Sequence, residues 1–145
     1  MKNMLANAIA LASEKHKGQF DKGGMPYILH PLKVMHYLKS DDLELMAIAV
    51  LHDVVEDTDV TFKDLSEMGM SSRIIQGVAA LTKMPGQTLD EYMTIIQDNP
   101  DAIRVKLADL RHNSDIRRLK GISDKDIARL QKYNSMYLVL KDLVD

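Results

Sequence analysis

The sequence has no cysteine and no tryptophan, and only 5% of its 145 residues are aromatic. Without cysteine the chain can form no disulfide and no thiolate metal site, and it has no thiol nucleophile. No apolar run approaches the roughly 18 residues that a membrane span needs, and the N-terminal segment is amphipathic, unlike a signal peptide. We therefore expect a cytoplasmic protein with no membrane partner.

An excess of either charge is also missing, because 19 Lys and Arg residues stand against 21 Asp and Glu residues, for a formal net charge of −2. This balance gives no general attraction to nucleic acid, so we expect no nucleic-acid partner, although enough basic residues remain for a local anion site. The hydrophobic content of 46% supplies the core of one domain, which we expect to span residues 1–145.

Segments with the strict apolar and polar alternation of strands are lacking, and the apolar residues recur at helical spacing. The sequence therefore predicts an all-α protein, a compact single-domain bundle whose short loops place consecutive helices side by side. A glycine-rich loop interrupts the pattern at residues 18–26. Capping residues and prolines predict helices over 1–16, from Pro31 to about Lys39, from Asp41 to about Thr58, over 61–68 and 73–81, from Thr88, from Pro100 to about Gly121, and from Ser123 onward.

The sequence Leu-His-Asp-Val-Val-Glu-Asp-Thr at residues 51–58 concentrates ionisable groups near the end of an otherwise apolar helix. On one continuous helix, Glu56 lies one turn beyond His52, and Asp57 lies one turn beyond Asp53. Acidic groups at the C-terminal end of a helix are disfavoured by about 0.3–1 kcal/mol each. A divalent cation held by His52 and Asp53 would supply the missing positive charge.

A second polar stripe lies in Val-Lys-Leu-Ala-Asp-Leu-Arg-His-Asn at residues 105–113, where one helix face carries Lys106, Asp109, His112 and Asn113. In a third place, His30 stands directly before Pro31, which predicts a fixed position at the start of a helix. Taken singly, such a histidine is more often a packed or capping residue than a metal ligand. Unrelated core residues therefore remain the alternative at this point.

Together with Tyr-Ile-Leu-His-Pro at residues 27–31, these two motifs resemble, in the same order, the motifs of the HD superfamily of metal-dependent phosphohydrolases. Within the superfamily the chain is most similar to the hydrolase domain of the bacterial alarmone enzymes and to the stand-alone small alarmone hydrolases. Those proteins remove pyrophosphate from the 3′ position of guanosine tetra- and pentaphosphate, usually with manganese. The resemblance therefore implies an HD-type helical bundle and a metal-dependent phosphohydrolase of a small-molecule nucleotide, most favourably guanosine-3′,5′-bis(diphosphate).

The resemblance also assigns roles to single residues. The metal ligands of the family correspond to His30, His52, Asp53 and Asp109. This mixed set of nitrogen and oxygen ligands suits manganese, and also iron or zinc. The catalytic pair of the family corresponds to Glu56, the expected general base, and Asp57, which would orient the nucleophile or protonate the leaving group. Asn113 corresponds to a family position that contacts the nucleotide. A highly charged substrate also needs cations beside it, which implies substrate-binding roles for Lys22, Lys106 and Arg111.

Three departures from the family pattern bear on the substrate. Asp21 stands where the alarmone hydrolases usually have an arginine, Leu-Arg-His-Asn replaces Arg-Leu-His-Asn and so moves the arginine to position 111, and Ile116 stands where a threonine is common. An HD phosphohydrolase for a different nucleotide is therefore one alternative. A non-catalytic, metal-stabilised module that senses a nucleotide is another, although the Glu56 and Asp57 pair argues against it. The oligomeric state is open, and a homo-oligomer is one alternative.

Overall fold

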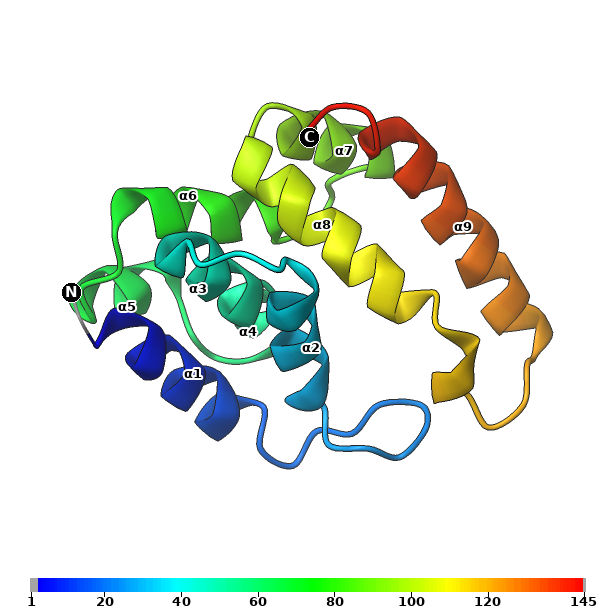
Figure 1. The fold of residues 1–145 in the computed structure, drawn as a ribbon, viewed down its shortest axis with the longest axis horizontal. Helices are drawn as coiled ribbons and strands as arrows, with labels where there is room; N and C mark the ends of the chain where they lie inside the picture. Colours follow the sequence, from blue (N-terminus) through cyan, green and yellow to red (C-terminus); the bar gives the residue numbers. More distant parts are fainter. Residues whose placement is uncertain (1–2, 145) are drawn as a thin grey trace.

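The computed structural model describes residues 3–144 as an assembly of helices (Figure 1). Met1 and Lys2, with which the first predicted helix begins, lie outside these residues. The only β pairing in the described part is one isolated bridge between Phe20 and Pro26, so the all-α prediction is confirmed. Over the same residues, no helix has the length and apolar character that a membrane crossing requires. The helical elements are α1 (Met4–Lys15), α2 (Leu29–Tyr37), α3 (Leu43–Leu51), α4 (Val54–Asp57), α5 (Phe62–Glu67), α6 (Ser72–Leu81), α7 (Leu89–Gln97), α8 (Pro100–Asn113), the 3₁₀ turn η1 (Ile116–Arg118) and α9 (Asp124–Leu140).

Three helices begin at the capping boxes that the sequence predicts, at Thr61, Thr88 and Ser123. In each box the cap hydroxyl accepts the backbone N–H of the third residue on, and the carboxylate of that residue accepts the backbone N–H of the cap. A good N-cap stabilises a helix by about 1 kcal/mol relative to alanine. Local sequence therefore fixes the starts of α5, α7 and α9.

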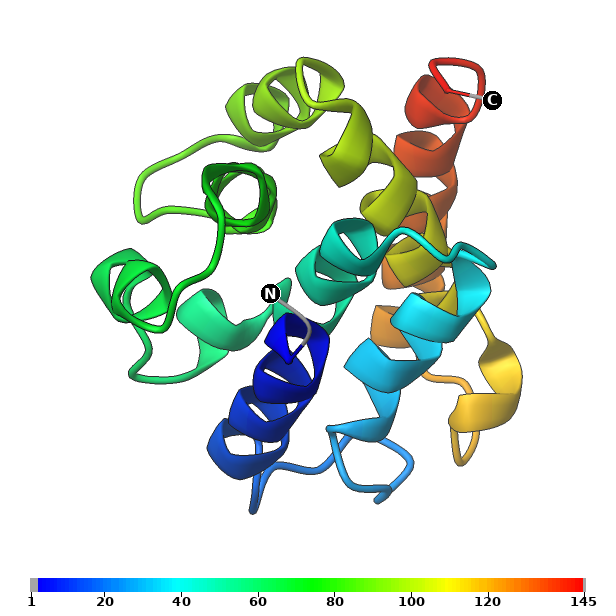
Figure 2. The same ribbon diagram turned by 60° about the vertical axis from the view of Figure 1, so that its left-hand side comes forward.

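The centre of the fold is α3, which is apolar apart from Glu44. The residues from Ala47 to Leu51 have no exposed surface, as expected for a helix that is buried on all sides. Helix α3 contacts α1, α2, α6 and α8, which lie around it in Figure 2. The close approach of α6 depends on Gly77, because a Cβ atom there would lie 2.6 Å from Cδ1 of Ile48.

Helix α8 crosses the molecule beside α9, as Figure 1 shows, and also packs against α2, α3, α6 and α7. Its buried side chains include Ala102, Ile103 and Val105. The helix ends at Asn113, where Ser114 follows as its cap, and not near Gly121 as predicted. The tight turn η1 replaces the predicted last turns, because Asp115 caps it by accepting the backbone N–H of Arg117.

The prediction of one helix from Asp41 to Thr58 is wrong, because α3 ends at Leu51 and α4 begins at Val54. Between them, Nδ1 of His52 lies 2.6 Å from the carbonyl oxygen of Ala49, and the hydroxyl of Tyr27 donates a hydrogen bond to Asp53. The break therefore accompanies side-chain contacts, one of them to a distant part of the chain. No glycine or proline marks it in the sequence.

The predicted start of α2 at Pro31 is also wrong. The helix begins at Leu29, after Ile28, so His30 lies inside its first turn. Proline is tolerated there because the first four N–H groups of a helix have no acceptor within the helix.

Arg73, in the first turn of α6, joins the starts of two other helices. Its guanidinium lies 2.7 Å from Asp42, the N-cap of α3, 3.1 Å from Glu44 in the first turn of α3, and 2.8 Å from Asp101 in the first turn of α8. Paired hydrogen bonds between arginine and carboxylates add geometric specificity to the attraction of charge. Arg73 thereby holds the N-terminal ends of α3, α6 and α8 together.

Candidate metal centre and active site

Three buried side chains from three different helical segments meet in the interior. His30 comes from α2, His52 directly follows α3, and Asp109 comes from α8. Nε2 of His30 lies 2.8 Å from Oδ1 of Asp109, and Nε2 of His52 lies 3.3 Å from the same oxygen. One potential ligand atom from each residue lies within 4.8 Å of the others, which is an arrangement that can hold a metal ion.

Asp53 faces the same point, as expected for the fourth ligand. Its Oδ2 lies 3.1 Å from Nε2 of His52 and 3.7 Å from Nε2 of His30. On a regular helix two adjacent side chains point about 100° apart. The break between α3 and α4 therefore allows both His52 and Asp53 to face one centre. We refer to His30, His52, Asp53 and Asp109 as the metal cluster.

Hydrogen bonds on the far side of each imidazole leave Nε2 directed at the cluster. Nδ1 of His52 donates to the carbonyl oxygen of Ala49, so Nε2 is the nitrogen that faces the two carboxylates. Nδ1 of His30 lies 2.8 Å from Nδ1 of His112, and the two rings stack at 13°. Because one ring must donate and the other accept, this contact orients the His30 ring. Burial and the positive charge of Arg118 lower the pKa of His112 to about 4, so His112 is neutral at pH 7.

Positive charge beside the metal cluster keeps both of its carboxylates ionised. Burial raises the pKa of Asp53, but the facing His52 and His30 lower it to a net value of about 2. Burial likewise opposes ionisation of Asp109, yet Lys106, His30 and His52 hold its pKa well below the ordinary value. Nζ of Lys106 lies 3.0 Å from Oδ2 of Asp109. Two ionised carboxylates and two imidazole nitrogens around one point are a donor set that fits a divalent transition metal.

The acidic pair predicted as catalytic lies on α4 and remains accessible. Oε1 of Glu56 accepts a hydrogen bond of 2.7 Å from the backbone N–H of Lys83, which holds the carboxylate in place. Partial burial raises the pKa of Asp57 to about 6, and the negative charges of Asp53 and Glu56 act in the same direction. A carboxyl group with this pKa is suited to gain and lose a proton near neutral pH.

A cavity of about 270 Å³ lies beside the metal cluster, and it collects two of the four predicted substrate contacts, Lys22 and Asn113. Nδ2 of Asn113 donates to Oδ1 of Asp109 at 3.1 Å, so the cavity and the metal cluster share a boundary. Lys106 is the third predicted contact, and it is paired with Asp109. The fourth, Arg111, is not brought to this place, because it lines a different cavity and lies 4.0 Å from the centre of the Tyr37 ring.

Two further residues of this region, Tyr27 and Arg118, are not among the predicted site residues. Tyr27 donates to Asp53 and lines the cavity of 270 Å³. Its place in the Tyr-Ile-Leu-His-Pro motif is the one signal in the sequence, because Tyr27 precedes α2 and shares no helix face with His30. Arg118 contacts both Asn113, at 3.3 Å, and Asp21, at 3.4 Å. No sequence pattern marks this contact, because Asp21 and Arg118 lie 97 positions apart.

Comparisons with known proteins agree with this geometry. A family profile described as HD domain matches residues 8–121. The chain is 35% identical over 122 residues to guanosine-3′,5′-bis(diphosphate) 3′-pyrophosphohydrolase MESH1 of Danio rerio, a match that covers 76% of this chain and 67% of that protein. It is also 35% identical over 122 residues to bifunctional (p)ppGpp synthase/hydrolase SpoT of Escherichia coli (strain K12), covering 75% of this chain and 17% of the relative. The chain thus spans only about a sixth of the length of such bifunctional relatives.

A solved structure of a metazoan orthologue of SpoT, described as hydrolysing ppGpp, superposes on the fold with a TM-score of 0.76. The alignment covers 94% of this chain and 84% of the other, at 23% sequence identity. This likeness confirms the predicted HD-type bundle. The profile match includes the metal cluster, and the identity to relatives extends along most of the sequence. The chain therefore belongs to the HD-domain family, among relatives that include the alarmone hydrolases.

Proposed function

We propose that the protein is a metal-dependent phosphohydrolase that converts guanosine-3′,5′-bis(diphosphate) and water to GDP and pyrophosphate. The observation that carries the proposal is the metal cluster, which contacts two residues of the cavity of about 270 Å³, Asn113 and Tyr27. The acidic pair follows Asp53 on α4. The names of the relatives MESH1 and SpoT support this choice of substrate.

We assign His30, His52, Asp53 and Asp109 as the metal ligands and manganese as the metal. The balance of two imidazoles and two carboxylates also admits iron or zinc. When bound, a divalent ion supplies a Lewis acid for the phosphoryl group and lowers the pKa of water. Lys106 already neutralises part of the charge of Asp109, and we assign it to the substrate phosphates as well.

The residues of α4 provide the proton transfers. Glu56 is the general base, which takes a proton from the attacking water as the water oxygen bonds to the phosphorus attached to O3′. The bond from that phosphorus to O3′ then breaks, and pyrophosphate leaves. Asp57, with a pKa of about 6, orients the water or returns a proton to O3′. The cavity receives the nucleoside, and Lys22 and Asn113 contact it there.

A second candidate, hydrolysis of a different nucleotide, rests on the pair of Asp21 and Arg118. The pair lines the same cavity, and the pKa of Asp21 is lowered by the backbone N–H of Met25 and by Arg118, against the effect of burial. An ionised carboxylate there accepts hydrogen bonds from a base and repels phosphate. The identity of the base therefore depends on Arg118 and on Asp21, which stands where the alarmone hydrolases usually have an arginine.

The deciding experiment measures pyrophosphate release from guanosine tetraphosphate by the full chain loaded with Mn²⁺. His52→Ala serves as the matched blank, and we expect its rate to be lower by at least about 100-fold. A panel of other nucleotides runs in parallel. No release from a folded, metal-loaded sample would exclude the alarmone as substrate. Release from another nucleotide would then favour the second candidate, and release from none would favour a sensing module.

A further inference from the structure

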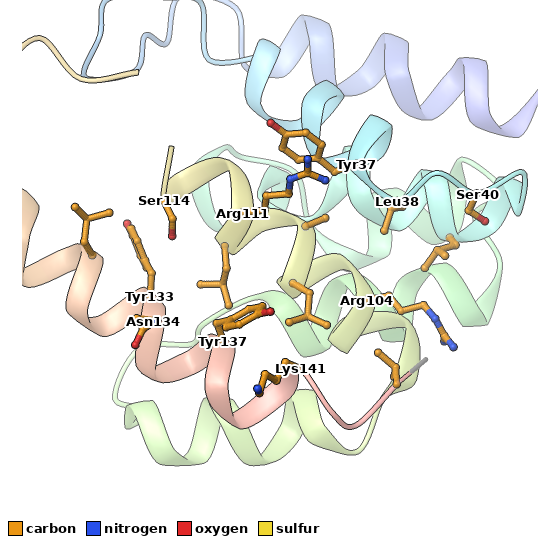
Figure 3. Close-up of a pocket in the computed structure, with 16 residues that line it drawn as sticks. Tyr37, Leu38, Ser40, Arg104, Arg111, Ser114, Tyr133, Asn134, Tyr137 and Lys141 are labelled. Carbon is orange, nitrogen blue, oxygen red and sulfur yellow. The ribbon is translucent and has the colours of Figure 1, made fainter. Parts of the chain in front are cut away.

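A larger cavity, of about 850 Å³, lies between α2, α8 and α9 (Figure 3), and none of the four residues of the metal cluster lines it. Helix α8 lines it with Arg104 and Arg111, which are seven residues apart and therefore share one face of the helix. At about 100° per residue, Asp109 points roughly 140–160° away from both arginines. The two sides of α8 thus serve different cavities, and we call this one the arginine cavity.

Positive charge in the arginine cavity has no acidic partner within residues 3–144. Of the six arginines in the chain, four form ion pairs with acidic residues: Arg73, Arg117, Arg118 and Arg129. The other two, Arg104 and Arg111, both line the arginine cavity, and so does Lys141. Among the described residues no Asp or Glu lines it. Such a site attracts anions, and arginine is the residue that best matches phosphate in shape and hydrogen bonding.

Aromatic side chains supply the rest of the surface. Tyr37, Tyr133 and Tyr137 line the cavity, one from α2 and two from α9. The guanidinium of Arg111 lies 4.0 Å from the centre of the Tyr37 ring, and Figure 3 shows the two side chains together at one edge. Tyr137 extends from α9 below them in the same view. Tyrosine rings and a flat guanidinium are surfaces on which a planar ring can stack.

We propose that the arginine cavity binds a small anionic ligand with an aromatic ring, of the class of the nucleoside phosphates, as a site separate from the metal cluster. The phosphates contact Arg104, Arg111 and Lys141, and the base lies against the tyrosines. The volume of about 850 Å³ falls in the usual range of ligand sites, roughly 300–1,000 Å³. Binding at this site requires no metal, so it can be tested independently of the proposed hydrolysis.

The test is a calorimetric titration of GTP into the full chain in the presence of EDTA, which removes metal from the metal cluster. We expect binding at one site, and we expect Arg104→Glu to weaken it by at least about tenfold, as for the loss of a charge-assisted hydrogen bond. Lys63→Glu is the matched control, because it makes the same change of charge at an exposed position on α5. Arg104→Gln and Arg111→Gln, made singly, replace the reversal variant if it does not fold.

Lys22→Glu locates the binding, because Lys22 lines the smaller cavity beside the metal cluster. We expect it to leave the binding of GTP in EDTA unchanged. Loss of binding in Lys22→Glu together with normal binding in Arg104→Glu would overturn the proposal, and so would absence of binding at millimolar GTP. Sedimentation of the same samples tests for a second copy of the chain in the cavity. A dimer that Arg104→Glu dissociates, with no GTP bound, would also overturn it.

Discussion

His112 supports the metal cluster through another residue, because its Nδ1 faces Nδ1 of His30 and not the metal position. Partners that orient a metal-binding histidine commonly change metal affinity by about 10- to 100-fold when they are removed. We expect a loss of this size in Mn²⁺ affinity for His112→Ala, and a smaller loss for His112→Asn, whose amide can still form the hydrogen bond. Competition with a chelating dye measures the affinity.

The control for this prediction is His36→Ala, which removes an exposed imidazole from the same helix as His30. It should leave the affinity for Mn²⁺ as it is. Equal affinities of His112→Ala and the parent protein would show that the contact between the two rings plays no part in holding His30.

Asp57 gives the metal-free protein a pH dependence of known sign. Its pKa is about 6 in the fold, against roughly 3.9 in an unfolded chain. Between these values the folded state holds a proton that the unfolded state has lost, so the free energy of unfolding falls as the pH rises, and it stays lower above pH 6. Asp57→Asn removes this effect. We expect the variant to be more stable than the parent by about 1 kcal/mol above pH 6, after allowance for solvent screening, and equally stable below pH 4.

Urea unfolding in EDTA at pH 4 and at pH 7 measures the difference. A gain in stability of equal size at both values would contradict the prediction, because it would not depend on ionisation. The same substitution removes a proposed catalytic carboxyl group, so the stability gain should accompany slower hydrolysis in the metal-loaded protein.

At the scale of helices and loops, the loop that carries Asp21 and Lys22 rests directly on η1. A Cβ atom at Gly23 would lie 2.3 Å from the carbonyl oxygen of Arg118, so Gly23→Ala must move the loop. The predicted metal ligands belong to other segments. We therefore expect the KM for guanosine tetraphosphate to rise by about tenfold and kcat to change less, because binding contacts are displaced while the reacting groups stay in place.

Gly69→Ala is the control in the same steady-state measurement. Gly69 has a positive φ of 89° and no atom within 4 Å of the added Cβ, so the substitution strains the backbone far from the loop. It should lower stability without a change in KM. If both variants raise KM alike, general destabilisation explains the effect and the contact of the loop with η1 does not.

At this scale, features with local causes follow from the sequence, and features that depend on distant residues do not. The capping boxes of α5, α7 and α9 depend on residues three positions apart, and the sequence predicts them correctly. The break after α3 accompanies the hydrogen bond from Tyr27 to Asp53, 26 positions apart, which no local pattern encodes. The choice of the four metal ligands came from the resemblance to a family, because a single histidine or aspartate has no distinctive surroundings in the sequence.

At the scale of the whole molecule, the all-α class and the HD-type bundle are confirmed by the structure and by its likeness to a solved relative. The family match confirms the resemblance of the motifs to the HD superfamily. The ligand and catalytic roles of single residues stay predictions, and so do manganese, a cytoplasmic location, the absence of a nucleic-acid partner and the extent of one domain over residues 1–145. Sedimentation of the full chain determines its oligomeric state.

The cluster around Arg73 has a consequence for the spacing of the metal ligands. Arg73 binds Asp42 at the start of α3 and Asp101 at the start of α8, so the segments leading to His52 and to Asp109 share one origin. Each residue of a helix advances the chain by about 1.5 Å and turns it by about 100°. The number of residues from Asp42 to His52, and from Asp101 to Asp109, therefore sets where the two predicted metal ligands lie and which way they point. Exchange of one apolar residue for another within these intervals leaves the direction of both side chains unchanged. Insertion or deletion of a single residue would turn His52 or Asp109 away from its partners.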